Sequence, residues 1–179
     1  MASTSPPASE RPLRRDAERN RLRILQAARE VFADRGLDAS LDQIAAHARV
    51  GVGTVYRRFP DKDTLIDALF EERIGEIAAA GQHALSAPDP WQGLVDFLQQ
   101  ANALLACDRG LRQVLLARGA HKAEGAREKI VPIATELVAR AQRAGSLRAD
   151  LDPLDLPVIQ LMVSAIADIT REVSPELWQ

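Results

Sequence analysis

The sequence predicts an all-α protein in which three N-terminal helices are joined by a long fourth helix to a C-terminal helical domain. Hydrophobic residues fill 46% of the 179 positions, enough for a buried core. Alanine and leucine, both strong helix formers, supply much of this share, and aromatic residues supply only 4%. β-branched residues nowhere form the alternating runs that predict a strand. These observations favour helices throughout.

Apolar residues at helical spacing predict four helices in the first half, over 16–35, 41–48, 52–59 and 62–85. Gly36 is placed to end the first of them. Ser40 and Gln43 form a capping-box pattern at the start of the second. Pro60 ends the third, and Asp61 can cap the fourth. The second and third are short and are separated by a tight break.

The second half is predicted to form helices over 91–106, 109–119, 123–144 and 153–173. Asp89 and Pro90 predict the start of the helix over 91–106, with Asp89 as the N-cap residue and Pro90 in the first turn. Gly145 is expected to end the third, within which Pro132 predicts a kink or a division into two pieces. Ser174, Pro175 and Glu176 have the N-cap, proline and acidic pattern that begins a helix. A stub or a shortened final helix is therefore expected over 174–179.

Charge is divided unevenly along the chain. Residues 1–62 carry 12 Lys and Arg against 8 Asp and Glu, whereas residues 63–179 carry 11 against 17. The net +4 of the first part suits a polyanion, and the net −6 of the remainder would be repelled by one. The predicted organisation is a disordered arm over 1–15, a DNA-binding domain over 16–62 and a helical domain over 63–179.

Several classes of protein are disfavoured. Cys107 is the only cysteine, so no intramolecular disulfide can form. No apolar run approaches the length of a membrane span, and no signal-peptide stretch is found, so a cytoplasmic protein without a membrane partner is expected. The sequence lacks a Gly-rich phosphate loop, a nucleophile elbow and a metal-ligand cluster, so we expect no enzyme, cofactor or metal site.

The functional prediction comes from residues 40–65. A short helix, a tight turn and a second short helix make the geometry that places one helix in the major groove of DNA. The apolar residues expected to hold the two helices together are Ile44, Ala45, Val50, Val55 and Phe59. The polar and basic residues expected to meet phosphates and base edges are Thr54, Tyr56, Arg57 and Arg58.

This segment resembles the helix-turn-helix signature of the TetR family. The match includes Ile44, Ala45, 50–63 and Leu65, and it extends over roughly residues 16–70. The resemblance implies that 52–59 is the recognition helix. It implies contacts to the DNA backbone from Thr54, Tyr56 and Lys62. The positions it places toward the groove are Gly51, Val52, Gly53, Val55 and Arg57, and Arg58 completes the expected DNA-binding set.

Two positions depart from the family pattern. Arg49 stands where members usually have a turn glycine, and a positive φ there would strain an arginine. Gly51 replaces the more common serine cap of the recognition helix. The polar residues of that helix have alternative interpretations that do not involve DNA. Tyr56 could be a core residue, and Arg57 and Arg58 could form a solvated face.

A basic run lies before the first expected buried positions. It resembles the arms with which some proteins enter the minor groove. A solubilising, disordered tail is the alternative interpretation. The run consists of Arg11, Arg14, Arg15 and Arg19.

Residues 90–172 resemble the variable ligand-binding and dimerisation region of the family, and 141–151 resemble a segment that precedes its penultimate helix. The candidate pocket-wall residues, for which ordinary core is the alternative, are Trp91, Leu94, Phe97, Leu98, Leu105, Leu111 and Leu115. In the family the last two helices of each subunit form a four-helix interface. The candidate interface residues are Leu161, Ser164, Ala165 and Ile169.

The resemblance implies a homodimeric transcriptional repressor that binds a palindromic DNA operator and is released by a small-molecule effector. An activator of the same family is the alternative, and a helical interaction protein without DNA binding is a more remote one. In either regulator, the long helix over 62–85 would connect the DNA-binding head to the effector site.

Overall fold

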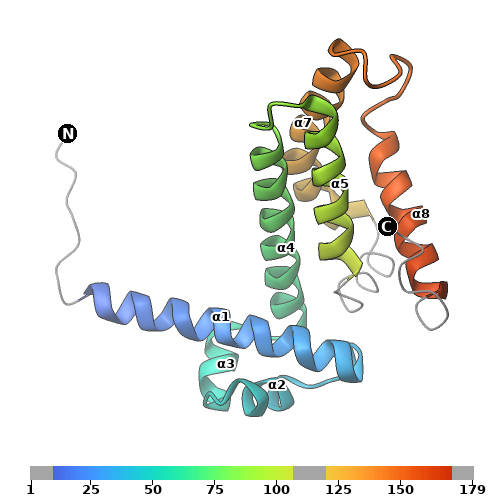
Figure 1. Ribbon diagram of the computed structural model, residues 1–179. Helices are drawn as coiled ribbons and strands as arrows, with labels where there is room; N and C mark the ends of the chain where they lie inside the picture. Colours follow the sequence, from blue (N-terminus) through green and yellow to red (C-terminus); the bar gives the residue numbers. More distant parts are fainter. Residues whose placement is uncertain (1–9, 107–119, 171–179) are drawn as a thin grey trace. The chain divides into compact units, whose positions relative to one another are not determined.

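The computed structural model describes residues 10–106 and 120–170 (Figure 1). Within these ranges every regular element is an α-helix, which confirms the predicted fold class. The expected helix over 109–119 and residues 171–179 lie outside the described residues. The helices are α1 (Glu10–Arg35), α2 (Leu41–Ala48), α3 (Val52–Arg58), α4 (Lys62–Ala84), α5 (Pro90–Ala106), α7 (Ala120–Arg143) and α8 (Asp155–Thr170).

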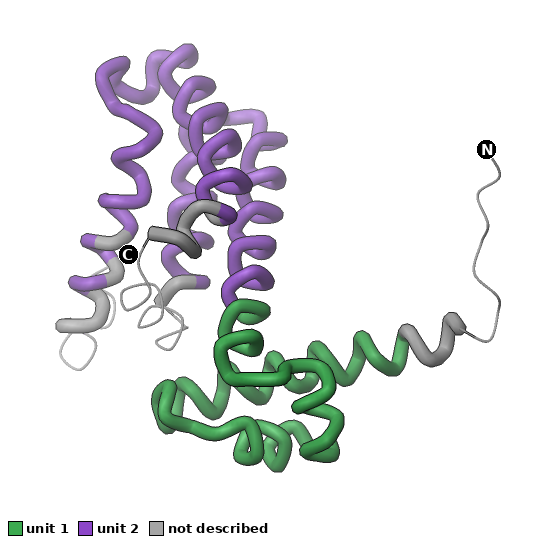
Figure 2. Tube along the Cα trace, turned by 180° about the vertical axis from the view of Figure 1, so that it is seen from behind, with its two compact units in different colours: residues 1–69 green, residues 70–179 purple. Residues whose placement is uncertain are grey.

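The chain divides into two compact units, unit 1 over residues 1–69 and unit 2 over residues 70–179 (Figure 2). This division falls within α4, later than the boundary predicted after Lys62. The first two turns of α4 belong to unit 1 because they carry buried apolar residues. These are Leu65, Ile66 and Leu69.

The first helix begins earlier than predicted. α1 starts at Glu10 rather than near Asp16, so residues 10–15 are helical and do not belong to a disordered arm. Pro12 falls in the first turn, where backbone amides have no partner within the helix and none is lost. The arginines and leucine that follow Pro12 are good helix formers, and the sequence-based boundary gave them too little weight.

The core of unit 1 receives a fully buried side chain from each of its helices. Ile24, Ile44, Val55 and Leu65, from α1 to α4 in order, have no exposed surface. Burial of an aliphatic side chain of this kind contributes about 1.5–3 kcal/mol. These four residues therefore hold α1, α2, α3 and the start of α4 in one packed arrangement.

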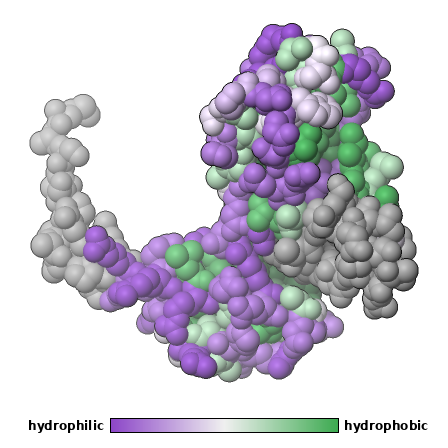
Figure 3. All heavy atoms as spheres, viewed as in Figure 1, coloured by the Kyte–Doolittle hydropathy of each residue, from purple (hydrophilic) through white to green (hydrophobic). Residues whose placement is uncertain are grey.

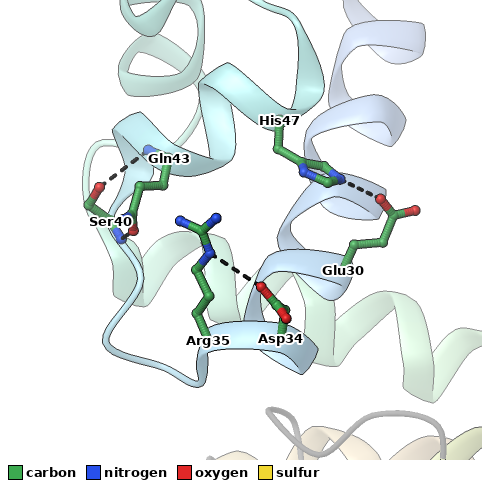
Figure 4. Close-up of polar contacts among 6 residues, drawn as sticks. All are labelled: Glu30, Asp34, Arg35, Ser40, Gln43 and His47. Atoms are coloured by element: carbon green, nitrogen blue, oxygen red, sulfur yellow. Dashed lines mark hydrogen bonds and ion pairs between the residues drawn. The ribbon is translucent and has the colours of Figure 1, made fainter.

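Local polar contacts fix the ends of α1 and α2 (Figure 4). The predicted capping box is present, since Ser40 Oγ accepts from the Gln43 amide at 3.2 Å and Gln43 Oε1 accepts from the Ser40 amide at 2.9 Å. Across the helix pair, Glu30 Oε2 lies 2.6 Å from His47 Nε2. A hydrogen bond from Gln26 and the contact with His47 lower the pKa of Glu30. Figure 4 also shows Arg35 paired with its neighbour Asp34.

In unit 2, the remainder of α4 packs with α5, α7 and α8 around one core. The largest fully buried side chains are those of Phe97, Leu137 and Val138, and α8 adds Leu156. Gly81 of α4 permits close packing, because a Cβ there would lie 2.5 Å from the Ile133 side chain. The core is therefore mainly aliphatic, with two phenyl rings, those of Phe70 and Phe97.

Two predicted features of α7 had different outcomes. Gly145 ends the segment as expected, with a φ of 73°. Pro132 does not divide the helix, so the expectation of two pieces is wrong. The proline is exposed, and its neighbours Ile133 and Ala134 are buried. Burial of the two residues that follow the proline offsets the loss of one hydrogen bond, so the helix continues.

Candidate DNA-binding site

The turn between α2 and α3 is formed by a left-handed residue. Arg49 has φ 54° and ψ 45°, and it is the only non-glycine residue with positive φ in the described ranges. Its amide donates to Ala46 O at 3.2 Å, and the Val50 amide donates to Ala45 O at 3.1 Å. This is the strain anticipated for an arginine at a glycine position, and it costs about 1 kcal/mol.

An arginine from α1 supports this turn. Arg23 Nη2 donates to the carbonyl of Ala48 at 3.0 Å and to that of Arg49 at 3.5 Å. A guanidinium at the C-terminal end of α2 satisfies free carbonyls and complements the negative end of the helix dipole. Sequence reasoning missed Arg23, because the contact joins positions about 25 residues apart and no local motif marks it.

Helix α3 is anchored on one side only. Gly51 begins it without a side-chain cap, and the Thr54 amide donates to Gly51 O at 2.8 Å. Val55 is fully buried, and Phe59, one turn later, is 3% exposed. The expectation that Val55 faces the DNA groove is therefore wrong. Its spacing of four from Phe59 on a helix marks a core position, as its predicted role in holding the helices together requires.

The opposite side of α3 is open. At 100° per residue, Gly53 and Arg57 lie about 160° from Val55, so they form the outer ridge of the helix. Both are exposed, and a Cβ on Gly53 would meet nothing within 4 Å. Val52 flanks this ridge on one side, and Thr54 and Arg58 flank it on the other. Gly51 is exposed just before the helix begins.

Tyr56 lies on the same flank as Val52, toward α2. It is 45% exposed, so the alternative role as a core residue is contradicted. The nearby carboxylate of Asp42 raises the pKa of the Tyr56 hydroxyl. A tyrosine hydroxyl is protonated at neutral pH even at its ordinary pKa, so it can donate a hydrogen bond.

Lys62 has a partner within unit 1. Its Nζ donates to the carbonyl of Leu37 at 2.6 Å and so ties the start of α4 to the loop between α1 and α2. The contact to DNA that the resemblance implies for Lys62 stays a prediction. The adjacent cap is as predicted, since Asp61 Oδ1 accepts from the Thr64 amide at 2.7 Å.

Three residues of α3 share a cleft with α1. The cleft has a volume of about 370 Å³. Its lining residues are Ala17, Asn20, Arg21 and Ile24 from α1, and Thr54, Arg57 and Arg58 from α3. Sequence reasoning identified the α3 residues and missed Asn20 and Arg21, which reach the site only through the packing of α1 on the helix-turn-helix.

The candidate pocket residues of unit 2 do not share one environment. Leu94 and Phe97 are buried in the core, and Leu98 packs against it. Trp91 is 43% exposed, and its role in a pocket wall stays a prediction. Its amide donates to Asp89 Oδ1 at 2.9 Å, which caps the start of α5 as expected. The side chain of Leu105, and Leu111 and Leu115, lie outside the described residues.

Among the side-chain amides in the described part of unit 2, two buried polar atoms have no hydrogen-bond partner. They are Asn102 Oδ1 on α5 and Gln160 Nε2 on α8, and these two helices pack together. A buried polar atom left unsatisfied costs about 1–3 kcal/mol, so a water molecule or a ligand group is the expected partner of each. Neither residue belongs to a motif, so sequence reasoning missed both.

The exposed side of α8 is apolar. Figure 3 shows hydrophobic side chains gathered along the side of unit 2 where Figure 1 draws α8. Every fourth residue contributes to this α8 stripe, with exposed fractions of 45–60%: Leu154, Val158, Met162 and Ile166. Among the predicted interface residues, Ala165 is exposed. The side chains of Leu161, Ser164 and Ile169 lie outside the described residues.

Two further features are absent from the described ranges. There, no helix is both long enough and apolar enough to cross a membrane. In the same ranges, no three His, Cys, Asp or Glu side chains come together as metal ligands.

Comparison with known proteins gives one consistent result. Residues 24–69 match the family described as bacterial regulatory proteins, tetR family, and residues 89–176 match the C-terminal domain of SbtR-like transcriptional regulators. The crystal structure of a TetR transcription regulatory protein from Mycobacterium vanbaalenii is 36% identical, with a TM-score of 0.70 over 90% of this chain and 98% of that one.

Other relatives agree. A TetR transcriptional regulator from Streptomyces coelicolor is 27% identical, with a TM-score of 0.67 over 88% of this chain and 93% of that one. An HTH-type transcriptional regulator of Staphylococcus aureus is 41% identical over 54 residues, which span 30% of this chain and only 29% of that protein. The similarity extends over both units in the solved structures and over the N-terminal region in the curated relative. The chain belongs to the TetR family of bacterial transcriptional regulators.

Proposed function

We propose that the protein is a transcriptional repressor that binds a palindromic DNA operator as a homodimer and is released by a small-molecule effector. The observation that carries the proposal is the division of α3 into a buried side and an open basic side. Val55 fixes the helix to unit 1, and Gly53 and Arg57 form its outer ridge. A helix anchored in this way can enter the major groove of DNA without loss of core packing.

The dimensions and chemistry of α3 suit that groove. An α-helix with its side chains is about 10–12 Å in diameter, and the major groove is about 12 Å wide. Arg57 on the ridge can donate two hydrogen bonds to O6 and N7 of a guanine. Gly53, which has no side chain, lets the backbone approach the bases closely. Tyr56 and Thr54 on the flanks carry hydroxyl donors for phosphate oxygens.

The proposal is tested by selecting duplexes from a randomised pool with the full chain. We expect enrichment of a near-palindromic sequence. Replacement of Arg57 by Ala is expected to weaken binding by about 1–3 kcal/mol and to relax the preference at one base pair of each half-site. Arg35→Ala, at the far end of α1, is the control and should change neither. Absence of enrichment, or an unaltered preference in Arg57→Ala, would contradict the proposal.

A second copy of the chain is the proposed occupant of the α8 stripe. Because its apolar residues recur every fourth position, they form one ridge that can pack against the same ridge of a partner across a two-fold axis. Two subunits would then place their α3 helices in successive major grooves, about 34–36 Å apart. Sedimentation of the complex with a selected duplex should give two chains per duplex.

The effector is proposed to bind in unit 2 at Asn102 and Gln160. Their free amide oxygen and nitrogen suit a small molecule that carries both a hydrogen-bond donor and an acceptor. The continuous helix α4, which passes from unit 2 into unit 1, would transmit the change. Compounds of a neutral small-molecule library that raise the melting temperature should release the selected duplex. In a promoter assay a repressor lowers transcription, whereas the alternative, an activator, raises it.

A further inference from the structure

The cleft between α1 and α3 is strongly basic. Of its seven lining residues three are arginines, and none is acidic. Asn20 and Thr54 add an amide and a hydroxyl, both of which can donate hydrogen bonds. Ala17 and Ile24 give the cleft an apolar floor. Guanidinium, amide and hydroxyl donors around one cleft are the chemistry that binds a phosphate group.

Arg21 is held in place for such a role. Its side chain is only 24% exposed, and Nη1 lies 3.2 Å from Oε1 of Glu18, one turn earlier on α1. Glu18 is 56% exposed and does not line the cleft. The ion pair thus restrains the guanidinium at the mouth of the cleft, which reduces the entropy that Arg21 would lose on binding an anion.

The cleft lies on a defined side of α3. Thr54 and Arg58 are on the flank that faces α1, whereas Tyr56 is on the flank that faces Asp42 of α2. A helix seated in the major groove has one sugar-phosphate backbone along each flank. Tyr56 therefore meets one strand, and the α1 flank meets the other.

We propose that this cleft is the seat of a DNA backbone phosphate, to which Arg21 and Asn20 of α1 donate together with Arg58 and Thr54 of α3. The inference rests on the proposed function and adds a second contact to the DNA backbone. The protein then contacts the sugar-phosphate backbones on both sides of the major groove, and one of these contacts includes residues of α1. Since a phosphate carries no base identity, these residues add affinity and orientation and leave sequence preference unchanged.

The salt dependence of binding tests this contact. Each phosphate contact contributes about −0.9 to the slope of log Kobs against log salt concentration on duplex DNA. Arg21→Ala should therefore reduce the magnitude of the slope by about 0.9 for each bound subunit, with the selected sequence unchanged. Arg35→Ala is the matched control, because Arg35 is likewise an arginine of α1 paired with an acidic neighbour, Asp34, but does not line the cleft. Equal melting temperatures of the two variants establish that both are folded.

A chemical probe of the DNA locates the contact. A neutral methylphosphonate placed at single positions of the selected duplex should weaken binding of the wild type at one position in each half-site. At that position Arg21→Ala should show no additional loss. An unchanged salt slope in Arg21→Ala, an altered base preference, or equal sensitivity of variant and wild type to the methylphosphonate overturns the inference.

The two proposals fail in different ways. If the wild type selects no sequence, the proposed function fails. The slope is then measured on a mixed-sequence duplex at low salt, where binding depends on phosphates alone. A reduced slope for Arg21→Ala on that duplex supports the phosphate seat, and an unchanged slope refutes it.

Discussion

Replacement of Val55 by Asp is expected to unfold unit 1 and to abolish DNA binding. Val55 is fully buried, so the variant loses the burial of an aliphatic side chain and places a carboxylate among Ile24, Ile44 and Leu65. The loss of burial costs about 1.5–3 kcal/mol, and the unpaired carboxylate adds several more. A total of about 4 kcal/mol or more is a large part of the stability of a small domain. Urea unfolding followed by circular dichroism measures it.

The matched control lies on the same helix. Val52→Asp introduces the same carboxylate at a position that is 45% exposed, in the first turn of α3, where the positive end of the helix dipole favours an acid. Its free energy of unfolding should stay within about 0.5 kcal/mol of the wild-type value. DNA binding should still weaken, because the new charge faces the phosphates. Equal stability of the two variants would show that α3 is not oriented as described.

Replacement of Gly93 by Ala is expected to destabilise unit 2 by about 1–3 kcal/mol. A Cβ at Gly93 would lie 2.7 Å from the backbone carbonyl oxygen of Ala84 and 3.1 Å from the Cβ of Ala87. Neither atom can rotate away, so the start of α5 must shift from the end of α4. Thermal unfolding of the full chain would show a lowered midpoint.

Gly75→Ala provides the comparison. Gly75 lies within α4, is exposed, and a Cβ there would meet nothing within 4 Å. Alanine is the better helix former by about 1 kcal/mol, so this substitution should raise stability. The same change of residue is therefore predicted to have opposite signs at two glycines of unit 2. A stabilising effect at Gly93 would contradict the close approach of α5 to α4.

Features that depend on neighbouring residues were predictable from the sequence. The capping box of Ser40 and Gln43, the cap of Asp89 on α5 and the glycine at 145 each require only residues within one turn. The short α2 and α3 follow from the same local signals. The left-handed Arg49 was anticipated because its position in the turn is one that glycine usually fills.

Features that depend on packing between helices were not predictable. Arg23 reaches the end of α2, and Arg21 reaches the cleft beside α3, only after α1 has docked on the helix-turn-helix. No local motif encodes either contact. Val55 shows the reverse case, since its position in the family motif suggested the groove, whereas its helical spacing from Phe59 already indicated the core. At a short helix with one anchored side, periodicity was the better guide.

The central claim is that the outer ridge of α3 enters the major groove, and methylation interference on the selected duplex tests it most directly. Methylation of guanine N7 projects into the major groove, and methylation of adenine N3 projects into the minor groove. The account predicts that N7 methylation within both half-sites blocks binding and that N3 methylation there does not. Interference from N3 methylation alone, with N7 methylation tolerated throughout, would contradict it.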